Sequence, residues 1–370
     1  MKRKKVLCVF GTRPEAIKLA PLIKELKGQR QFTCRVCVTS QHTTLLHDVL
    51  RAFRITPHYD LNLMRDNQKL DQLHARVLTT METVLEKEKP SLVIVQGDTT
   101  SAFCAALAAF YKKIPLAHIE AGLRSFDKYL PFPEEINRRL ISVMTDFHFC
   151  PTVQARTNLR NEGVAAKSLF VVGNTVLDAL RLISSKKKRF SYGPLQKFCG
   201  GKEVILVTLH RRETWGKHLE MICRTLKRLA ADFDDYRFVF PVHPNPKVNK
   251  TVRRLLGKDK RFFICPALTY PDFVLLMNRS YLVLTDSGGV QEEAPSLNKP
   301  VVVLRDVTER PEIIKSGAAV LAGTDPEKIA RITRKLLSLP QAYRLMTGKK
   351  NPYGDGHASQ KIVSIIKKAL

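Results

Sequence analysis

Three acidic side chains stand just after predicted strands or at a predicted helix start, where acid–base groups are commonly placed. Asp98 follows the apolar run 92–95, Glu120 ends the strand expected near 114–119, and Glu134 opens a predicted helix. Parallel strands place their carboxyl ends at one edge of the sheet, so side chains from separate loops can meet there. Positioned carboxylates can remove a proton from carbon and return one to it. We therefore take these three residues as candidate acid–base groups.

Each of these carboxylates also has a purely structural interpretation. Asp98 can cap the helix that follows it, and Glu120 can form an ion pair with Arg124. Glu134 lies in the first turn of a predicted helix, where an acid suits the helix dipole. The sequence alone leaves these alternatives open.

The stretch from Gly11 to Lys18 is a candidate anion site. It follows an apolar run at 6–10, and Gly11 and Pro14 suit a sharp turn into a helix. Free backbone N–H groups at such a helix start lie beside Arg13 and Lys18, and phosphate commonly binds there. An ordinary turn with two solvated cations explains the same residues equally well. Neither a GxGxxG nor a GxxxxGK[ST] pattern is present, so no dinucleotide or Walker site is predicted.

A second strand-to-helix turn, in the other half of the chain, carries a stronger anion signal. Ser287, Gly288 and Gly289 open a predicted helix, and the two glycines allow a phosphate to approach the backbone closely. Glu293 on the same helix has the reach for a ribose diol. Three more polar residues of this half stand after predicted strands, although prolines around the second indicate a structural turn: His210, His243 and Arg310.

The charge balance is unusually basic. The chain has 62 Lys and Arg against 34 Asp and Glu, a formal net charge of +28. Nucleic acid, an anionic membrane or an anionic substrate would each suit such a field. The cations are spread along the chain without an RNP, zinc-finger or basic-zipper pattern, so we expect no specific nucleic-acid partner. No apolar stretch approaches the ~20 residues that cross a bilayer, so we expect no membrane partner.

The cysteines predict neither a metal site nor a disulfide. Eight are scattered along the chain, and Cys34 and Cys37 lie three apart on a predicted strand, facing opposite sides. Buried, reduced thiols indicate a cytoplasmic protein. The initial basic and apolar residues are too short a run for a signal peptide.

Strands and helices alternate in both halves, which predicts an α/β protein with two doubly wound, Rossmann-like domains. We expect the first domain at 1–183, joined by a helix at 357–370, a connection at 184–201 and a second domain at 202–356. Ligands of such domains bind at strand ends, hence in the cleft between the two. The expected strands are 5–10, 32–39, 91–96, 114–119, 146–150, 168–172, 203–208, 236–241, 262–265, 281–285, 300–304 and 318–321.

Eight motifs in order resemble the non-hydrolysing UDP-N-acetylglucosamine 2-epimerases. They cover nearly the whole chain: GTRPEAIK, QGDTT, HIEAGLRS, PFPEEINR, HRRET, PVHPNP, SGGVQEEAPSLNKP and TERPE. The resemblance implies a glycosyltransferase-B-like fold and no metal or other cofactor. It also implies a homodimer and a role in envelope polysaccharide synthesis. The implied reaction expels UDP from C1 by anti elimination, gives a bound 2-acetamidoglucal, and re-adds UDP with the proton returned to the other face of C2.

The resemblance assigns roles to matching positions. Asp98, Glu120 and Glu134 are implied to be the acid–base carboxylates. Contacts to the leaving diphosphate are implied for three cationic or imidazole side chains, which are His210, Arg13 and Lys18. Contacts to the nucleotide are implied for Ser287, Gly288, Gly289, Glu293 and Arg310.

The chain departs from the family pattern around a second, regulatory UDP-sugar site. The stretch 41–44 reads QHTT where many bacterial members have QHR, and Asn67 stands where an arginine is common. Gln41, Glu135 and His243 remain as candidates for that site, but activation by substrate is in doubt. Asn298 replaces a usual glycine.

Three other functions stay open on the sequence. A glycosyltransferase of the same architecture, or a hydrolysing relative, would act on the same UDP-sugar. A polyanion-binding protein would use the +28 charge, but it leaves the strand-end carboxylates unexplained.

Overall fold

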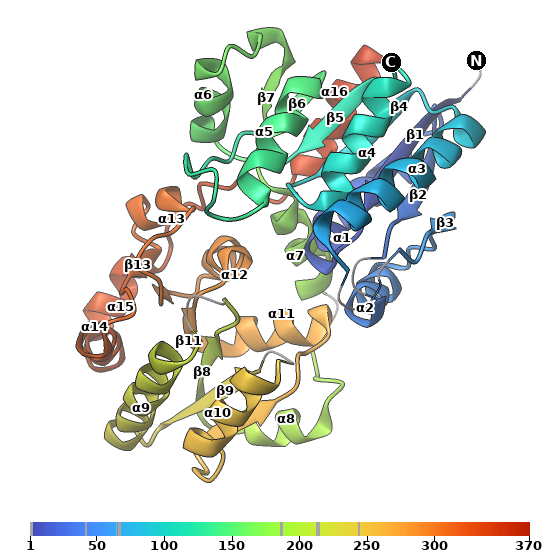
Figure 1. The fold of residues 1–370 in the computed structure, drawn as a ribbon. Coiled ribbons are helices and arrows are strands. Elements are labelled where there is room, and N and C mark those ends of the chain that lie inside the picture. Colours follow the sequence, from blue (N-terminus) through green and yellow to red (C-terminus); the bar gives the residue numbers. More distant parts are fainter. Residues whose placement is uncertain are drawn as a thin grey trace. The chain divides into compact units, whose positions relative to one another are not determined.

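The computed structural model describes residues 3–40, 43–63, 65, 68–185, 188–211, 215–242 and 245–370. The chain divides into two compact units, one of Met1–Leu182 with Tyr353–Leu370 and one of Ile183–Pro352. Each unit contains one parallel sheet with helices on both faces (Figure 1). The prediction of an α/β fold with two doubly wound, Rossmann-like sheets is confirmed.

The first sheet has the strand order β3-β2-β1-β4-β5-β6-β7, with every pair parallel. All six strands expected here are present. The sequence analysis missed β3, which has only two residues and no periodic pattern. The strands are β1 (Lys4–Phe10), β2 (Phe32–Val38), β3 (Tyr59–Asp60), β4 (Leu92–Gln96), β5 (Leu116–Ile119), β6 (Phe147–Cys150) and β7 (Leu169–Val171).

Helices cover both faces of this sheet because β2 and β3 are added on one side of β1, and the strands from β4 onward are added on its other side. On one face α1 packs against α2 and the C-terminal α16, and on the other α3, α4 and α5 pack in sequence. Alanines at 102, 105, 106, 108 and 109 are buried on α4 and allow close packing on the sheet. The helices are α1 (Arg13–Lys27), α2 (Thr43–Phe53), α3 (Leu70–Glu88), α4 (Thr100–Tyr111), α5 (Glu134–Met144), α6 (Val153–Asn161), α7 (Thr175–Ser184) and α16 (Ala358–Ala369).

The second sheet has the order β10-β9-β8-β11-β12-β13, again with parallel pairs. Its core is formed by apolar residues of these strands and of α9, α10 and α14, which include Ile205, Leu226 and Phe238. The strands are β8 (Glu203–Thr208), β9 (Tyr236–Pro241), β10 (Phe262–Cys265), β11 (Ser280–Thr285), β12 (Val301–Val303) and β13 (Ala319–Leu321). The helices are α8 (Gly193–Phe198), α9 (Lys217–Asp232), α10 (Pro246–Leu256), α11 (Tyr270–Arg279), α12 (Gly288–Glu293), α13 (Pro311–Lys315), α14 (Pro326–Ser338) and α15 (Pro340–Met346).

Asn298 has a structural explanation. It follows the short 3₁₀ helix η3 (Ala294–Leu297) with φ of 61°, in the left-handed region. Asparagine tolerates this region better than other residues with a Cβ. Its side-chain oxygen also accepts a hydrogen bond from the backbone N–H of Gly348. The residue therefore keeps the backbone turn that glycine would otherwise permit.

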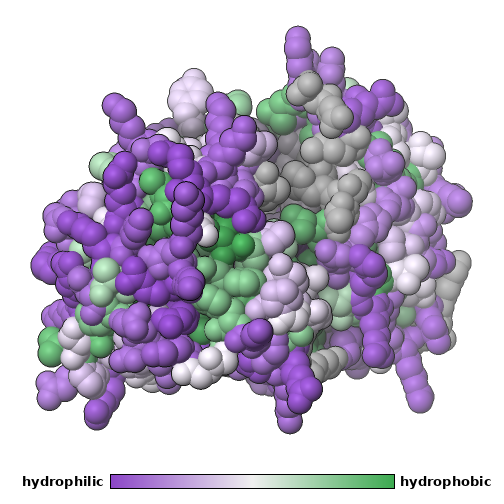
Figure 2. Space-filling view, turned by 90° about the horizontal axis from the view of Figure 1, so that it is seen from below, coloured by the Kyte–Doolittle hydropathy of each residue, from purple (hydrophilic) through white to green (hydrophobic). Residues whose placement is uncertain are grey.

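Hydrophilic side chains cover much of the surface. Figure 2 shows one face of the molecule, which is covered largely by hydrophilic side chains. None of the described helices combines the length and the apolar character that crossing a membrane would need.

Candidate active site

In the first unit the strand order reverses between β1 and β4, and the turns after these two strands are tied together by Glu15. Its buried carboxylate accepts hydrogen bonds from the N–H groups of Gly11 (3.0 Å) and Thr12 (2.7 Å) and from the Thr99 hydroxyl (2.6 Å). Burial raises the pKa of Glu15, and these hydrogen bonds oppose that rise. Such a switch point is where doubly wound sheets bind ligands.

Gly11 is required by close approach rather than by its backbone angles. A Cβ at this position would lie 2.2 Å from the Thr39 hydroxyl oxygen and 2.3 Å from that of Ser101. These two hydroxyls are themselves hydrogen bonded at 2.5 Å. The start of the first anion-site stretch is therefore packed too tightly for any side chain.

Glu120 lies at the end of β5 and receives donors from three elements. The Lys18 ammonium is 2.6 Å from both carboxylate oxygens, the Gln96 amide donates to one, and the Asn174 amide donates to the other at 3.4 Å. All four residues are buried, and Glu120 has φ of 66°, a strained value for a residue with a side chain. Three converging donors favour the ionised carboxylate and fix its orientation. Lys18 is therefore engaged with Glu120, a partner that the sequence analysis did not assign.

Glu120 is ion-paired, as its structural interpretation expected, but the partner is Lys18 and not Arg124. The Arg124 side chain pairs with Glu162 at 2.7 Å and donates to the Ser142 hydroxyl at 3.0 Å. These bonds engage its guanidinium away from Glu120.

Asp98 does not cap α4, so the helix-cap interpretation of this residue is wrong. The N-cap is Thr99, whose hydroxyl accepts from the N–H of Ala102 at 3.2 Å. The Asp98 carboxylate instead lies 2.5 Å from the Arg138 guanidinium, while the Asn137 amide donates to the Asp98 carbonyl at 2.9 Å. Two successive residues of α5 thus hold both the backbone and the side chain of Asp98.

The remaining first-unit candidates are placed by α1 and α5. Arg13 is the first residue of α1 and Glu134 the first of α5, and both are half-buried. Glu135 is completely buried and accepts hydrogen bonds from the N–H groups of Ser125 (3.0 Å) and Phe126 (3.3 Å). Its carboxylate therefore secures the loop that precedes α5, and its part in a regulatory site stays a prediction. The other two regulatory candidates, Gln41 and His243, lie outside the described residues.

His118 is hydrogen bonded to the turn that carries Asp98, and it makes the stability of the first unit sensitive to acid. Its buried ring donates from Nε2 to the carbonyl of Gly97 at 2.7 Å, and burial lowers the pKa of His118 to about 3. A histidine in the unfolded chain has a pKa of about 6.5, so as pH falls the unfolded state is protonated at a higher pH than the folded state. Stability is therefore lost as pH falls from about 6.5 towards 3.

Replacing His118 with glutamine, which keeps a donor but does not titrate, should flatten this loss. Between pH 7 and 4.5 we expect the wild type to lose about 2–3 kcal/mol more unfolding free energy than the variant. Urea unfolding at the two pH values measures it. The same change at the exposed His218 serves as the control, and an identical pH slope in all three proteins would contradict the assignment.

In the second unit the strand order reverses between β8 and β11, and Asp286 joins the turns after them. Its fully buried carboxylate accepts from the N–H groups of His210 (3.0 Å) and Arg211 (3.0 Å) and lies 3.1 Å from His210 Nδ1. Burial alone would raise the pKa of Asp286, but the hydrogen bond and charge of His210 and the two N–H groups hold it below its usual value. Asp286 therefore orients His210, whose ring is 43% exposed.

A cluster of arginines surrounds the Ser-Gly-Gly turn. A Cβ on Gly288 would lie 3.7 Å from an Arg310 guanidinium nitrogen and 3.8 Å from one of Arg211. Glu309 lies 3.5 Å from Arg211 and 3.6 Å from Arg305, and Arg310 is paired with Glu292. Arg211 and Arg310 therefore bring two guanidinium groups beside the backbone of this turn. This arrangement suits a bound anion such as a phosphate.

Ser287 and Glu293 lie at the two ends of α12. Ser287 is its N-cap residue, and its hydroxyl makes no capping hydrogen bond. Glu293 is buried and accepts a 2.6 Å hydrogen bond from the Tyr270 hydroxyl, and its other oxygen is 3.9 Å from a Cβ placed on Gly289. Tyr270 therefore fixes a carboxylate beside the glycines.

Sequence reasoning missed the residues that hold the candidates in place. Gln96 lies in the motif QGDTT and Arg138 in PFPEEINR, whereas Asp286 lies directly before the motif that begins at Ser287. Asn174 lies outside every motif used. Motif membership would have been a signal for Gln96 and Arg138, and only the strand order brings Asn174 to Glu120.

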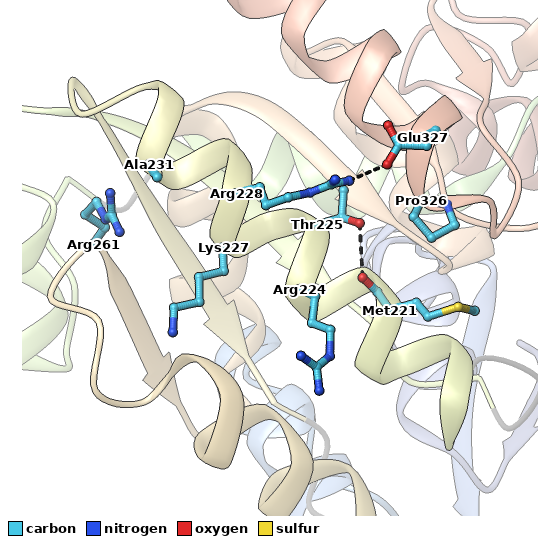
Figure 3. Close-up of a pocket in the computed structure, with 9 residues that line it drawn as sticks. All are labelled: Met221, Arg224, Thr225, Lys227, Arg228, Ala231, Arg261, Pro326 and Glu327. Carbon is cyan, nitrogen blue, oxygen red and sulfur yellow. Dashed lines mark hydrogen bonds and ion pairs between the residues drawn. The ribbon is translucent and has the colours of Figure 1, made fainter.

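A pocket elsewhere in the second unit contains none of these residues (Figure 3). It has a volume of about 690 Å³ and lies along α9. Arg228 in it pairs with Glu327 at 2.6 Å, and Arg261 pairs with Asp259 at 2.7 Å, so much of its positive charge is neutralised. Among the described residues no group of three or more His, Cys, Asp and Glu could hold a metal ion.

Comparison with known proteins gives a consistent result. The family model described as UDP-N-acetylglucosamine 2-epimerase matches residues 24–367. The chain is 48% identical to the UDP-N-acetylglucosamine 2-epimerase of Yersinia pestis, over 98% of each chain. It is 46% identical to that of Escherichia coli (strain K12), again over 98% of each chain. The crystal structure of UDP-GlcNAc 2-epimerase from Neisseria meningitidis bound to UDP-GlcNAc is similar with a TM-score of 0.92 and 44% identity, over 98% of this chain and 100% of that one.

Proposed function

The chain belongs to the UDP-N-acetylglucosamine 2-epimerase family, and from this premise we propose that it interconverts UDP-N-acetylglucosamine and UDP-N-acetylmannosamine without net hydrolysis. The observation that carries the proposal is the pair of carboxylates in the first unit, each held against a buried cation. Asp98 lies against Arg138 and Glu120 against Lys18. Inverting a carbon centre that bears hydrogen needs proton acceptors and donors fixed in this way.

The proposed reaction is an elimination followed by an addition. A carboxylate removes the proton from C2, the C2–H electron pair becomes the second bond between C1 and C2, and the C1–O electron pair leaves with the β-phosphate of UDP. The product is a 2-acetamidoglucal. UDP then re-forms the C1–O bond, and a carboxylic acid returns a proton to the opposite face of C2. The overall change is an isomerisation, so the chemistry calls for no oxidant or reductant.

Roles for the named residues follow from their chemistry. We assign proton transfer to Asp98, Glu120 and Glu134. A departing UDP carries negative charge, and preorganised cations and N–H donors stabilise such a leaving group. Six residues take this task, with Lys18 serving Glu120 as well: Arg13, Lys18, His210, Ser287, Gly288 and Gly289. Arg310 supports the phosphate side, and Glu293 takes the ribose hydroxyls.

The proposal is tested by incubating the protein with UDP-N-acetylglucosamine in deuterated water. We expect deuterium at C2 of both UDP-sugars, because the abstracted proton exchanges with solvent before return. Mass spectrometry and proton NMR measure it. Product without deuterium would contradict the mechanism. Release of free N-acetylmannosamine would show a hydrolysing enzyme, and transfer to an added acceptor without exchange would indicate a glycosyltransferase.

We also propose a cytoplasmic homodimer that supplies envelope polysaccharide synthesis. An exposed apolar row supports self-association: Ile136, Leu140 and Val143 follow one face of α5 at helical spacing and are 37%, 44% and 85% exposed. Phe110 and Tyr111 at the end of the neighbouring α4 are also exposed. Exposed apolar patches of this kind commonly mark protein interfaces.

A further inference from the structure

Arg138 is a buried guanidinium with one close partner among the described residues. The residue is 6% exposed, and its Nη2 lies 2.5 Å from the Asp98 carboxylate. Its Nη1 is 3.5 Å from Glu135, beyond good hydrogen-bond geometry, and neither Nη1 nor Nε has a hydrogen-bond partner in the described part of the chain. Asp98 is therefore the closer of the two carboxylates that pair with Arg138.

Glu135 is poorly placed to replace Asp98 as that partner. Its carboxylate accepts from two backbone N–H groups of the loop before α5, and Arg139 approaches it at 3.6 Å. Protonating Asp98 would remove the carboxylate charge 2.5 Å from the buried Arg138 and leave it Glu135 at 3.5 Å, which Arg139 also approaches. Weakening the pairing of a buried charge is costly. The pair therefore favours ionised Asp98.

We propose that Arg138 is a positioning residue that holds Asp98 ionised and oriented, so that Asp98 enters the reaction as the proton acceptor. The inference rests on the proposed function, because a proton acceptor is meaningful only if the protein removes a proton from its substrate. Asn137 on the same helix supports the assignment by fixing the Asp98 carbonyl at 2.9 Å.

The other charged or titratable groups around the Asp98 turn are accounted for. His118 of β5 donates to the Gly97 carbonyl and stays neutral, because burial lowers its pKa to about 3. Glu120 lies 3.9 Å from a Cβ placed on Gly97 and is paired with Lys18. Glu15 reaches the turn through the Thr99 hydroxyl. From α5, Arg138 pairs with Asp98 and Glu135 lies 3.5 Å from Arg138, while Glu134 begins the same helix.

The test compares Arg138→Met and Arg138→Lys with wild type in steady-state epimerisation across pH. For the methionine variant we expect kcat to fall at least tenfold, KM to change less than threefold, and the acid limb of the kcat profile to move up by about one pH unit. The lysine variant keeps the charge and should retain the wild-type limb within about 0.3 units, even with reduced kcat. Guanidinium ion added to an Arg138→Gly variant should restore part of the activity.

Arg124→Met is the matched control, since Arg124 is an equally buried arginine of the same unit that pairs with Glu162. It should lower stability without moving the acid limb. An unmoved acid limb in Arg138→Met, or an equal shift in Arg124→Met, would overturn the proposal. If Arg138→Met does not fold, the lysine variant decides instead. An acid limb that moves up by about one pH unit in Arg138→Lys, although the positive charge is kept, would overturn the proposal. Wild type that fails to place deuterium at C2 would refute the proposed function itself, and the inference with it.

Discussion

Replacing Glu120 with glutamine is expected to lower kcat by about 10³-fold while UDP binds with nearly unchanged affinity. General acid–base catalysis contributes typically about 10²–10⁴-fold, and a glutamine amide cannot exchange a proton in this way. The fold around the position should persist, because glutamine has the same shape. Initial rates of epimerisation and calorimetric titration with UDP measure the two quantities. A variant with more than a tenth of the wild-type kcat would remove Glu120 from the proposed mechanism.

The same substitution should also cost stability, which gives an internal control. In the structure the buried Lys18 ammonium lies 2.6 Å from both Glu120 oxygens. The substitution leaves this ammonium opposite a neutral group. Breaking a buried pair costs about 3–5 kcal/mol. Adding Lys18→Met should recover most of that stability but none of the activity. If the double variant regained turnover, the activity loss in Glu120→Gln would have to be assigned to misfolding rather than to chemistry.

Much of the fold could be predicted because its elements are local patterns. Apolar runs marked twelve strands, and the alternation with helices indicated two parallel sheets, both of which are confirmed. β3 escaped because two residues carry no periodicity. The candidate residues were also found locally, since Asp98, Glu120 and His210 each follow a strand.

The partners of these residues could not be predicted, because they come from distant parts of the chain. Glu120 is 102 residues from Lys18 and 54 from Asn174, and His210 is 76 from Asp286. Only the strand order decides which loops become neighbours. Local reasoning instead paired Glu120 with the nearby Arg124, and it offered Asp98 as a helix cap although Thr99 takes that position. Nearest-in-sequence partners were the wrong choice at both carboxylates.

Replacing Asp286 with asparagine should affect both stability and turnover, because this carboxylate is shared between the fold and His210. Its oxygens accept two backbone N–H groups and face the His210 ring at 3.1 Å. An asparagine carries no charge and presents one NH₂ group where an acceptor is needed. We expect a loss of about 3–5 kcal/mol in unfolding free energy and a fall in kcat of about 10²-fold, since a misoriented donor no longer stabilises the leaving diphosphate. Urea unfolding and initial rates measure these effects.

The pH dependence separates the charge of Asp286 from its shape. The folded pKa of Asp286 lies below its usual value, so the stability it contributes is present above about pH 4 and disappears as pH falls through the folded pKa. Wild type and Asp286→Asn should therefore differ most near neutral pH and converge in strong acid. Asp272→Asn is the matched control, because Asp272 is a buried acid of the same unit that accepts the Ser191 N–H at 2.8 Å. It should lose stability while keeping kcat. Equal kcat losses in the two variants would mean that His210 is not oriented by Asp286, and that the second unit stabilises UDP through its arginines and backbone N–H groups alone.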